Sequence, residues 1–301
     1  MHTKVRFHLM VRVLSFVLIL CAIGIRLAEA LPRQEVPQVT EVVEIVDYPT
    51  LLYTPPVKQA VTFSASDAAF APILNWSGET VDAEALIQAP LDITVTNEPL
   101  ILILHTHATE AYCNISGFRT EDKTQNVVRV GQALADTLNQ NGIRTIHDTT
   151  LIDLDGYYDS YARAGEIIES YLEQYPSIQM VIDVHRDSAT DSNGKQVVLS
   201  TPYQDGSAAQ LMFVMGTDNG GLYHPNWQGN VSFALKLQAL CEQEVSGIFR
   251  NLNLRSQRYN QHYTPYSVLV EFGSAGNTLD EALNSAEIFA NALITLLNQN
   301  R

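Results

Sequence analysis

Apolar runs of strand length alternate with amphipathic stretches of helical spacing from residue 99 to the C-terminus. The apolar runs cover 100–104, 143–147, 180–184, 211–215 and 267–272. The helical stretches cover 124–141, 157–175, 231–252 and 279–298, and Gly142 follows the first of them as a stop signal. Strands that are apolar on both faces and alternate with helices are typical of parallel sheets. The pattern therefore predicts an α/β fold with a mostly parallel central sheet and helices on both faces.

The N-terminus has the pattern of an export segment. Basic residues, the last of which is Arg12, precede an uncharged apolar run at 13–25, and Ala28-Glu29-Ala30 resembles a small-x-small cleavage site. The run is shorter than the roughly 20 residues of a full membrane span. Residues 1–30 are therefore predicted to be either a cleaved signal peptide or a retained membrane anchor. In both cases the rest of the chain is expected to be extracytoplasmic, membrane-anchored or secreted.

Residues 31–95 differ from the rest in being rich in proline and weak in periodicity. Short strands are candidates at 39–46 and 51–53, but no catalytic constellation is visible there. We interpret 31–95 as an extracytoplasmic linker or accessory region that lifts the following domain from the membrane. The catalytic domain is then predicted to span 96–301.

The composition excludes some classes of function. The formal net charge is −15, whereas proteins that bind nucleic acid or an anionic membrane surface need a cationic face. The three cysteines, Cys21, Cys113 and Cys241, form no Cys-x-x-Cys pair, so a thiolate zinc site is not expected. Whether Cys113 and Cys241 form a disulfide stays open, because sequence does not show how close they lie.

Polar residues suited to catalysis follow three of the predicted strands. The first strand leads into His105-Thr106-His107-Ala108-Thr109-Glu110, the strand at 180–184 leads into His185, and the strand at 267–272 contains Glu271 near its end. In α/β sheets, functional groups collect beyond the carboxyl ends of the strands. These side chains are therefore expected to meet at one edge of the sheet.

The set of side chains suits a zinc hydrolase. His107 and Glu110 are spaced to face one ion, and a distant His185 supplies a third ligand, which leaves a position for water. Water activated in this way attacks a carbonyl, and a carboxylate that is not a ligand, here Glu271, serves as general base. His105 stays an alternative to His107, which is favoured because it completes His-x-x-Glu.

Neighbouring residues allow two interpretations each. Asp183 either orients the His185 imidazole or is a turn acid at the strand end. Arg186 is a candidate catalytic residue that binds a substrate carboxylate or the developing oxyanion, although an ion pair with Asp187 is slightly favoured. Tyrosines that precede the last strand either stack on sugar or peptide or, as favoured, pack within loops; they are Tyr223, Tyr259, Tyr263 and Tyr266.

Four segments resemble the signatures of the stage II sporulation protein P family, from about residue 98 to the C-terminus. The first matches His-Thr-His-x-x-Glu-x-Tyr at 105–112, and the second matches Asn-Val-x-x-Val-Gly at 126–131. The third matches Asp-hydrophobic-His-Arg-Asp at 183–187. The fourth matches Val-Glu-x-Gly followed by Asn-Thr-x-x-Glu-Ala, at 270–273 and 277–282.

The resemblance implies a membrane-anchored peptidoglycan hydrolase that acts in engulfment during sporulation. Members are zinc-dependent N-acetylmuramoyl-L-alanine amidases with a further endopeptidase activity on peptide cross-links. Their catalytic domain is similar to those of zinc amidases, and their partners are stage II sporulation proteins D and M. Carried over, the roles make His107, Glu110 and His185 the Zn²⁺ ligands and Glu271 the catalytic acid and base.

One departure and two rival functions accompany this resemblance. The wider zinc amidases have Gly-His-Gly-Gly after the first strand and take a Glu ligand from the start of the next helix, where the nearest acids here are Glu121 and Asp122. The first rival is an exported zinc carboxypeptidase or deacylase with another amide substrate. The second is a wall-binding scaffold whose site is degenerate.

Overall fold

The computed structural model describes residues 62–298. The predicted export segment at 1–30 and the candidate strands at 39–46 and 51–53 lie outside the described residues. Among the described residues, no helix has both the length and the hydrophobicity needed to cross a bilayer.

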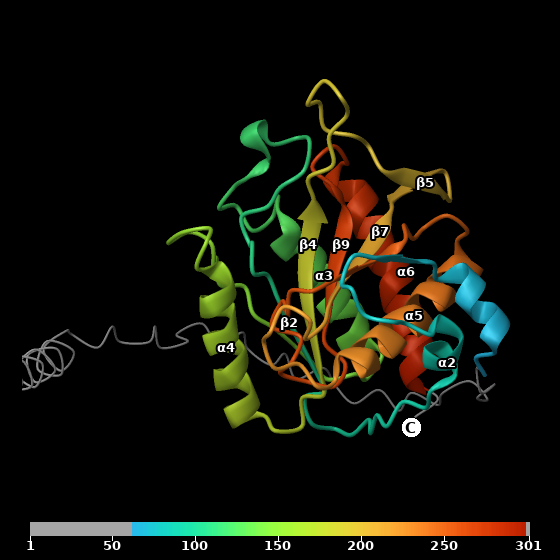
Figure 1. Ribbon diagram of the computed structural model, residues 1–301. Helices are drawn as coiled ribbons and strands as arrows, with labels where there is room; N and C mark the ends of the chain where they lie inside the picture. Colours follow the sequence, from blue (N-terminus) through green and yellow to red (C-terminus); the bar gives the residue numbers. More distant parts are fainter. Residues whose placement is uncertain (1–61, 299–301) are drawn as a thin grey trace, which may run out of the picture. The chain divides into compact units, whose positions relative to one another are not determined.

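A seven-stranded sheet forms the centre of the described chain, in the order β1-β8-β7-β9-β4-β2-β3 (Figure 1). Its strands are β1 (Ile73–Asn75), β2 (Ile101–Leu104), β3 (Thr145–His147), β4 (Met180–Asp187), β7 (Leu211–Gly216), β8 (Leu252–Arg255) and β9 (Val268–Ser274). Neighbouring strands are parallel except for β7 and β9, which are antiparallel. The predicted mostly parallel sheet is confirmed, with β1, β8 and β7 running opposite to the other four strands. A separate hairpin consists of β5 (Ser200–Tyr203) and β6 (Gly206–Ala209).

Helices cover both faces of the sheet, as predicted. The helices α3 (Val127–Gln140), α5 (Trp227–Glu244) and α6 (Leu279–Asn298) pack together on one face, with the short α2 (Ala83–Gln88) against α5. The helix α4 (Ser160–Gln174) lies on the other face. Alternate residues of β2 explain this, because Ile101 and Ile103 join the large core while Leu102 and Leu104 pack with Ile168 of α4. Two short 3₁₀ helices, η1 (Ala65–Phe70) and η2 (Ser116–Phe118), complete the elements.

The start of α3 fixes the position of two histidines beneath it. Asn126 caps the helix by accepting a hydrogen bond from the backbone N–H of Val128 at 3.0 Å. One turn later, a Cβ atom at Gly131 would lie 2.5 Å from His105 Cε1 and 2.9 Å from His147 Nε2. Glycine at this position therefore lets the helix approach the two imidazoles.

Two sequence predictions need correction at β8 and the edge strand β1 beside it. The helix predicted for 231–252 covers 227–244, and residues 252–255 form β8. The helix ends at Glu244, because the next residue, Val245, has extended backbone angles, and Gly247 turns the chain with φ +79°. Residues 252–255 then alternate between buried and half-buried as strands do. In addition, residues assigned to the linker contribute β1, which pairs with β8, and α2. The folded part therefore begins before the predicted boundary at 96.

The two described cysteines are free thiols. Cys113 is exposed, whereas Cys241 is buried within α5. The disulfide that the sequence left open is therefore not formed between them.

Candidate metal and catalytic site

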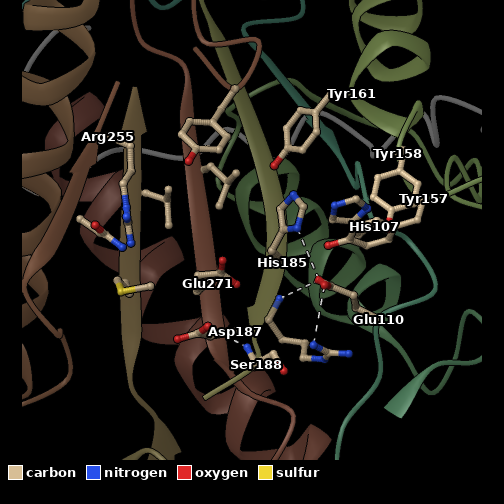
Figure 2. A pocket seen from close by; sticks show the side chains of 16 residues that line it. His107, Glu110, Tyr157, Tyr158, Tyr161, His185, Asp187, Ser188, Arg255 and Glu271 are labelled. Carbon is tan, nitrogen blue, oxygen red and sulfur yellow. Dashed lines mark hydrogen bonds and ion pairs between the residues drawn. The ribbon is translucent and has the colours of Figure 1, made fainter. Parts of the chain in front are cut away.

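The predicted residues meet in a pocket between the start of α4 and the sheet face formed by β4, β9, β7 and β8. The cavity has a volume of about 550 Å³, and its lining includes His107, Glu110, His185 and Glu271 (Figure 2). His185 and Glu271 are paired in register on the neighbouring strands β4 and β9. Because β9 continues to Ser274, Glu271 projects from the face of the sheet and not from beyond its edge. The expectation of an edge site is corrected in this respect.

A tight turn carries His107 and Glu110 into the pocket. The backbone N–H of Glu110 donates to the carbonyl of His107 at 3.0 Å. Asp153 anchors the turn by accepting hydrogen bonds from the backbone N–H and hydroxyl of Thr109, at 3.0 and 2.8 Å, and by an ion pair with Arg119. The spacing of His-x-x-Glu thus places both side chains on one side of a fixed turn.

The side chain of His107 is held by residues at the start of α4. The Ser160 hydroxyl donates to the Tyr157 carbonyl at 2.6 Å and lies 3.2 Å from His107 Nδ1. The hydroxyl oxygen therefore accepts a hydrogen bond from the Nδ1–H group, which leaves Nε2 as the nitrogen with a free lone pair. The Tyr157 ring stacks on the imidazole, with ring centres 4.1 Å apart and planes 7° from parallel. Burial lowers the pKa of His107, which favours the neutral form that binds metals.

Acidic side chains lie at both nitrogens of His185. Nε2 lies 2.9 Å from Asp183 Oδ1, in a contact too bent for a regular hydrogen bond, and Nδ1 lies 3.4 Å from Glu110 Oε2. Asp183 is fixed by the backbone N–H and hydroxyl of Thr106, at 2.8 and 2.6 Å. Asp183 therefore lies beside the imidazole, as the first of its two interpretations expects, and its orienting role stays a prediction. Burial acts to lower the pKa of His185, but the charges of Asp183 and Glu110 outweigh it and raise this pKa well above its ordinary value.

Glu110 is a buried carboxylate that stays ionised. Burial acts to raise its pKa, but the hydrogen bond from His185 and the charges of His185 and Arg186 lower it below the ordinary value. The backbone N–H of Arg186 also donates to Glu110 Oε2 at 3.2 Å. A negative charge is therefore maintained beside the two imidazoles.

These donors fit zinc in type and in two of their separations. Zinc binds nitrogen and oxygen ligands tetrahedrally at about 2.1 Å, which places two ligand atoms about 3.4 Å apart and two imidazole centres about 5 Å apart. The observed values are 3.4 Å between His185 Nδ1 and Glu110 Oε2, and 5.3 Å between the rings of His107 and His185. Among residues 62–298, however, no three His, Cys, Asp or Glu side chains already form a complete group that would hold a metal ion.

Glu271 faces the pocket without a partner. Its Oε2 atom is shielded from solvent and accepts no hydrogen bond, and burial raises the pKa of Glu271 to about 8. A carboxyl group whose pKa lies near neutrality exchanges protons readily at physiological pH. The position and the pKa of Glu271 suit a general base.

The alternative ligand His105 points away from this pocket. Its Nδ1 lies 3.1 Å from the Val184 carbonyl, and its Nε2 lies 2.9 Å from Nε2 of His147. Burial lowers the pKa of His105 to about 4. The structure therefore brings His107, and not His105, together with Glu110 and His185.

Arg186 does not form the ion pair with Asp187 that the sequence slightly favoured. The Arg186 guanidinium donates from Nε to the Ala111 carbonyl at 2.9 Å and from Nη2 to the Phe118 carbonyl at 2.8 Å. Asp187 forms an ion pair with Arg250 at 2.8 Å. Because Nε and Nη2 are engaged by backbone carbonyls, Arg186 holds the loop after Glu110 in place. It also lines the pocket, with Nη1 3.7 Å from Glu110 Oε1, and its contact with substrate stays a prediction.

The sequence missed most of the aromatic side chains that line the pocket. Tyr157, Tyr158 and Tyr161 come from the start of α4 and had no neighbouring motif to indicate them. Of the predicted tyrosine cluster, Tyr259 alone lines the pocket. Tyr266 is buried and packs on Phe233, as favoured. The acids Glu121 and Asp122 are exposed and do not line the pocket.

Comparison with known proteins decides the family. The model of the stage II sporulation protein P family matches residues 66–294. The chain belongs to this family. Stage II sporulation protein P of Bacillus subtilis (strain 168) is 26% identical over 213 residues, which cover 65% of this chain and 51% of that protein. The chain thus spans about half the length of this curated relative of the stage II sporulation protein P family.

Solved amidases are similar in fold at low identity. The CwlD amidase from Clostridioides difficile, solved in complex with the GerS lipoprotein, is 14% identical with a TM-score of 0.45, covering 66% of this chain and 98% of that one. The catalytic domain of CwlV, an N-acetylmuramoyl-L-alanine amidase from Bacillus (Paenibacillus) polymyxa var. colistinus, is 10% identical with a TM-score of 0.40, covering 66% and 98%. Because these TM-scores are below 0.5, nothing about the activity of this chain follows from them.

Proposed function

We propose that the protein is a zinc-dependent N-acetylmuramoyl-L-alanine amidase that cleaves the bond between N-acetylmuramic acid and L-alanine in peptidoglycan. The observation that carries this proposal is the unpartnered carboxylate of Glu271 in the same pocket as His107, Glu110 and His185. Membership of the stage II sporulation protein P family supports peptidoglycan as the substrate and sporulation as the process. Cleavage of peptide cross-links is a further expectation.

The proposed ligands each have a partner that fixes their orientation. His107 would bind zinc through Nε2, because its Nδ1 faces Ser160. His185 would bind through Nδ1, because Asp183 lies at Nε2, and Glu110 would complete the set. When bound, zinc supplies a Lewis acid that activates water and polarises the amide carbonyl.

Glu271 is proposed to move the proton. Its ionised carboxylate takes a proton from the attacking water and then donates it to the leaving amine, which departs as a neutral group. No hydrogen bond competes for Glu271 Oε2, so this atom is free to accept the proton. The pKa of about 8 keeps the protonated form accessible near neutral pH, as the second step requires.

Location and partners are proposed from the family and the N-terminal pattern. We expect an extracytoplasmic protein, held at the membrane if residues 1–30 are not cleaved, that acts with stage II sporulation proteins D and M. Fractionation of sporulating cells with an antibody to this chain tests the location. Recovery in the cytoplasmic fraction would contradict it.

The activity is tested with the purified full chain, zinc and isolated sacculi, followed by mass spectrometry of the products. The wild type is expected to release free stem peptide from intact glycan. Glu271→Gln should retain zinc and lose at least about 10³-fold of the rate, since it cannot accept the proton. Glu173→Gln, the same change at an exposed position on α4, serves as the control and should behave as wild type.

The products also separate the rival functions. Loss of single residues from the end of the stem peptide would indicate a carboxypeptidase, and release of acyl groups alone would indicate a deacylase. Purification without stoichiometric zinc, together with intact sacculi, would indicate a wall-binding scaffold. If Glu271→Gln lost zinc as well as activity, Glu271 would be a ligand and the assigned role would be wrong.

A further inference from the structure

A second polar group lies in the pocket, away from the proposed metal ligands. Arg255 and Asn253 are two residues apart on β8, so their side chains project from the same face of the sheet into the pocket. Figure 2 shows Arg255 on the opposite side of the pocket from His107. Neither residue takes part in the function proposed above.

Arg255 differs from the other arginines near the pocket in lacking a partner. Arg186 donates to backbone carbonyls and Arg250 pairs with Asp187. Within residues 62–298, no hydrogen bond or ion pair of the half-buried Arg255 side chain is found. Its guanidinium nitrogens are not shielded from solvent, so this cation is open to an anionic ligand that enters the pocket.

Asn253 adds an unpaired group beside it. Its Oδ1 atom is buried and has no hydrogen-bond partner among the described residues. Buried polar atoms are rarely left unpaired, because each costs about 1–3 kcal/mol. Such an atom in a pocket wall indicates that the occupant of the pocket supplies a donor, as the N–H groups of a peptide do.

The loop after β8 closes this part of the pocket with Tyr259. The loop lies so close to β7 that a Cβ atom at Gly216 would be 2.2 Å from the Gln257 carbonyl oxygen. Tyr259 itself has φ +48°, a left-handed conformation that is rare for non-glycine residues. Burial raises the pKa of Tyr259, and the charge of Arg255 opposes this rise, so guanidinium and phenol lie within electrostatic range. The group is therefore held by rigid backbone.

The spacing to Glu271 suits an extended peptide. β8 is separated from β9 by β7, and two strand spacings amount to about 10 Å. The register of β7, in which Met212 pairs with Glu271 and Gly216 pairs with Arg255, adds an offset of four residues, or about 13 Å, along the strands. The pocket wall between them is apolar, formed by Met212 and Val214 of β7. The two backbone positions are therefore about 16 Å apart, and because an extended peptide advances about 3.3–3.6 Å per residue, this corresponds to about four or five residues.

We propose that Arg255, with Asn253 beside it, binds a carboxylate of the stem peptide about four or five residues from the amide that is cleaved. Arginine suits this because its planar fork binds a carboxylate through two parallel hydrogen bonds. This subsite rests on the proposed function for its substrate class. It is separate from Arg186, whose Nε and Nη2 are engaged by backbone carbonyls.

Binding without turnover tests the subsite. The probes are two synthetic muramyl pentapeptides, one with every carboxylate free and the other with every carboxylate converted to carboxamide. Their affinities for the zinc-loaded full chain carrying Glu271→Gln are measured by isothermal titration calorimetry. The free acid is expected to bind at least about 10-fold more tightly, as loss of a charge-assisted pair predicts.

Variants then assign this preference to Arg255. Adding Arg255→Gln should remove the preference for the free acid, and Arg255→Lys should retain part of it because the charge remains. Arg258→Gln is the matched control, since Arg258 donates to the Tyr223 carbonyl and does not line the pocket, and it should keep the full preference. A preference that survives Arg255→Gln, or no preference in the parent protein, would overturn the proposal.

The outcome is separable from that of the proposed function. Failure of the wild type to cleave sacculi, combined with an Arg255-dependent preference, would reject the amidase activity and keep the carboxylate subsite. Cleavage of sacculi without any Arg255-dependent preference would support the amidase activity and reject the carboxylate subsite. In an active enzyme, Arg255→Gln should raise KM by at least about 10-fold and leave kcat nearly unchanged, because uniform binding energy is lost.

Discussion

Replacing Asp183 with asparagine should weaken zinc binding although Asp183 is not itself a proposed ligand. Its carboxylate lies 2.9 Å from His185 Nε2 and accepts two hydrogen bonds from Thr106, at 2.8 and 2.6 Å. Asparagine has nearly the same shape but lacks the charge and one acceptor oxygen. Loss of such an orienting group typically lowers metal affinity about 10- to 100-fold, or about 1.4–2.7 kcal/mol.

A competition titration against a fluorescent zinc chelator measures this loss at pH 7. Asp148→Asn is the control, because Asp148 is equally buried but bonds to Thr150 and Tyr171 instead of a proposed ligand. Burial acts to raise the pKa of Asp183, but His185 and Thr106 outweigh it and lower this pKa. Its stabilising effect on the fold is therefore present above the unfolded pKa of about 4 and lost as the pH falls through the lower folded value. An Asp183→Asn protein that melts as the control does and binds zinc as tightly as wild type would refute the reasoning.

Three further predictions concern the other pocket residues. His107→Gln should abolish stoichiometric zinc binding, whereas His105→Gln should retain it, as measured by elemental analysis. His105→Gln should also lower the free energy of unfolding by about 1–3 kcal/mol in thermal melts, because it loses the contact with His147. In metal-free protein, Glu271→Gln should stabilise the fold by up to a few kcal/mol at pH 8 and have no effect at pH 4. The folded pKa of Glu271 is raised to about 8, so ionisation of this carboxyl opposes folding at any pH above its unfolded pKa. Equal melting temperatures of wild type and variant at pH 8 would contradict this. Tyr157→Ala uncovers one face of His107, so a chelator should remove zinc several-fold faster in stopped-flow measurements.

Sequence patterns located most of the sheet because its central strands are buried on both faces. The run that became β2 is continuously apolar, the runs of β4 and β9 are apolar apart from Asp183 and Glu271, and α3 and α6 have clear helical spacing. β8 was missed because Leu252 and Leu254 also fit the period of the preceding helix, although Gly247 gave a stop signal. β1 has only three residues after Pro72, too few for a pattern. The reversal at β7 depends on long-range packing, which no local signal records.

The proposed ligands were recognisable from the sequence because they follow buried strands in motifs. The spacing of His-x-x-Glu favoured His107 over His105 but left His105 as an alternative, because no local signal shows that His105 lies under Gly131 of α3. The carboxylate subsite was not visible either. Arg255 has no motif around it, and its significance appears only when the partners of Arg186 and Arg250 are known.

The most direct test of the account is a crystal structure of the zinc-loaded full chain, with data collected on both sides of the zinc absorption edge. We predict one anomalous peak in the pocket, with His107 Nε2, His185 Nδ1 and a Glu110 oxygen at about 2.0–2.2 Å. Glu271 should face the peak without ligating it. Zinc bound by His105 or Glu271, or a pocket without zinc, would contradict the account.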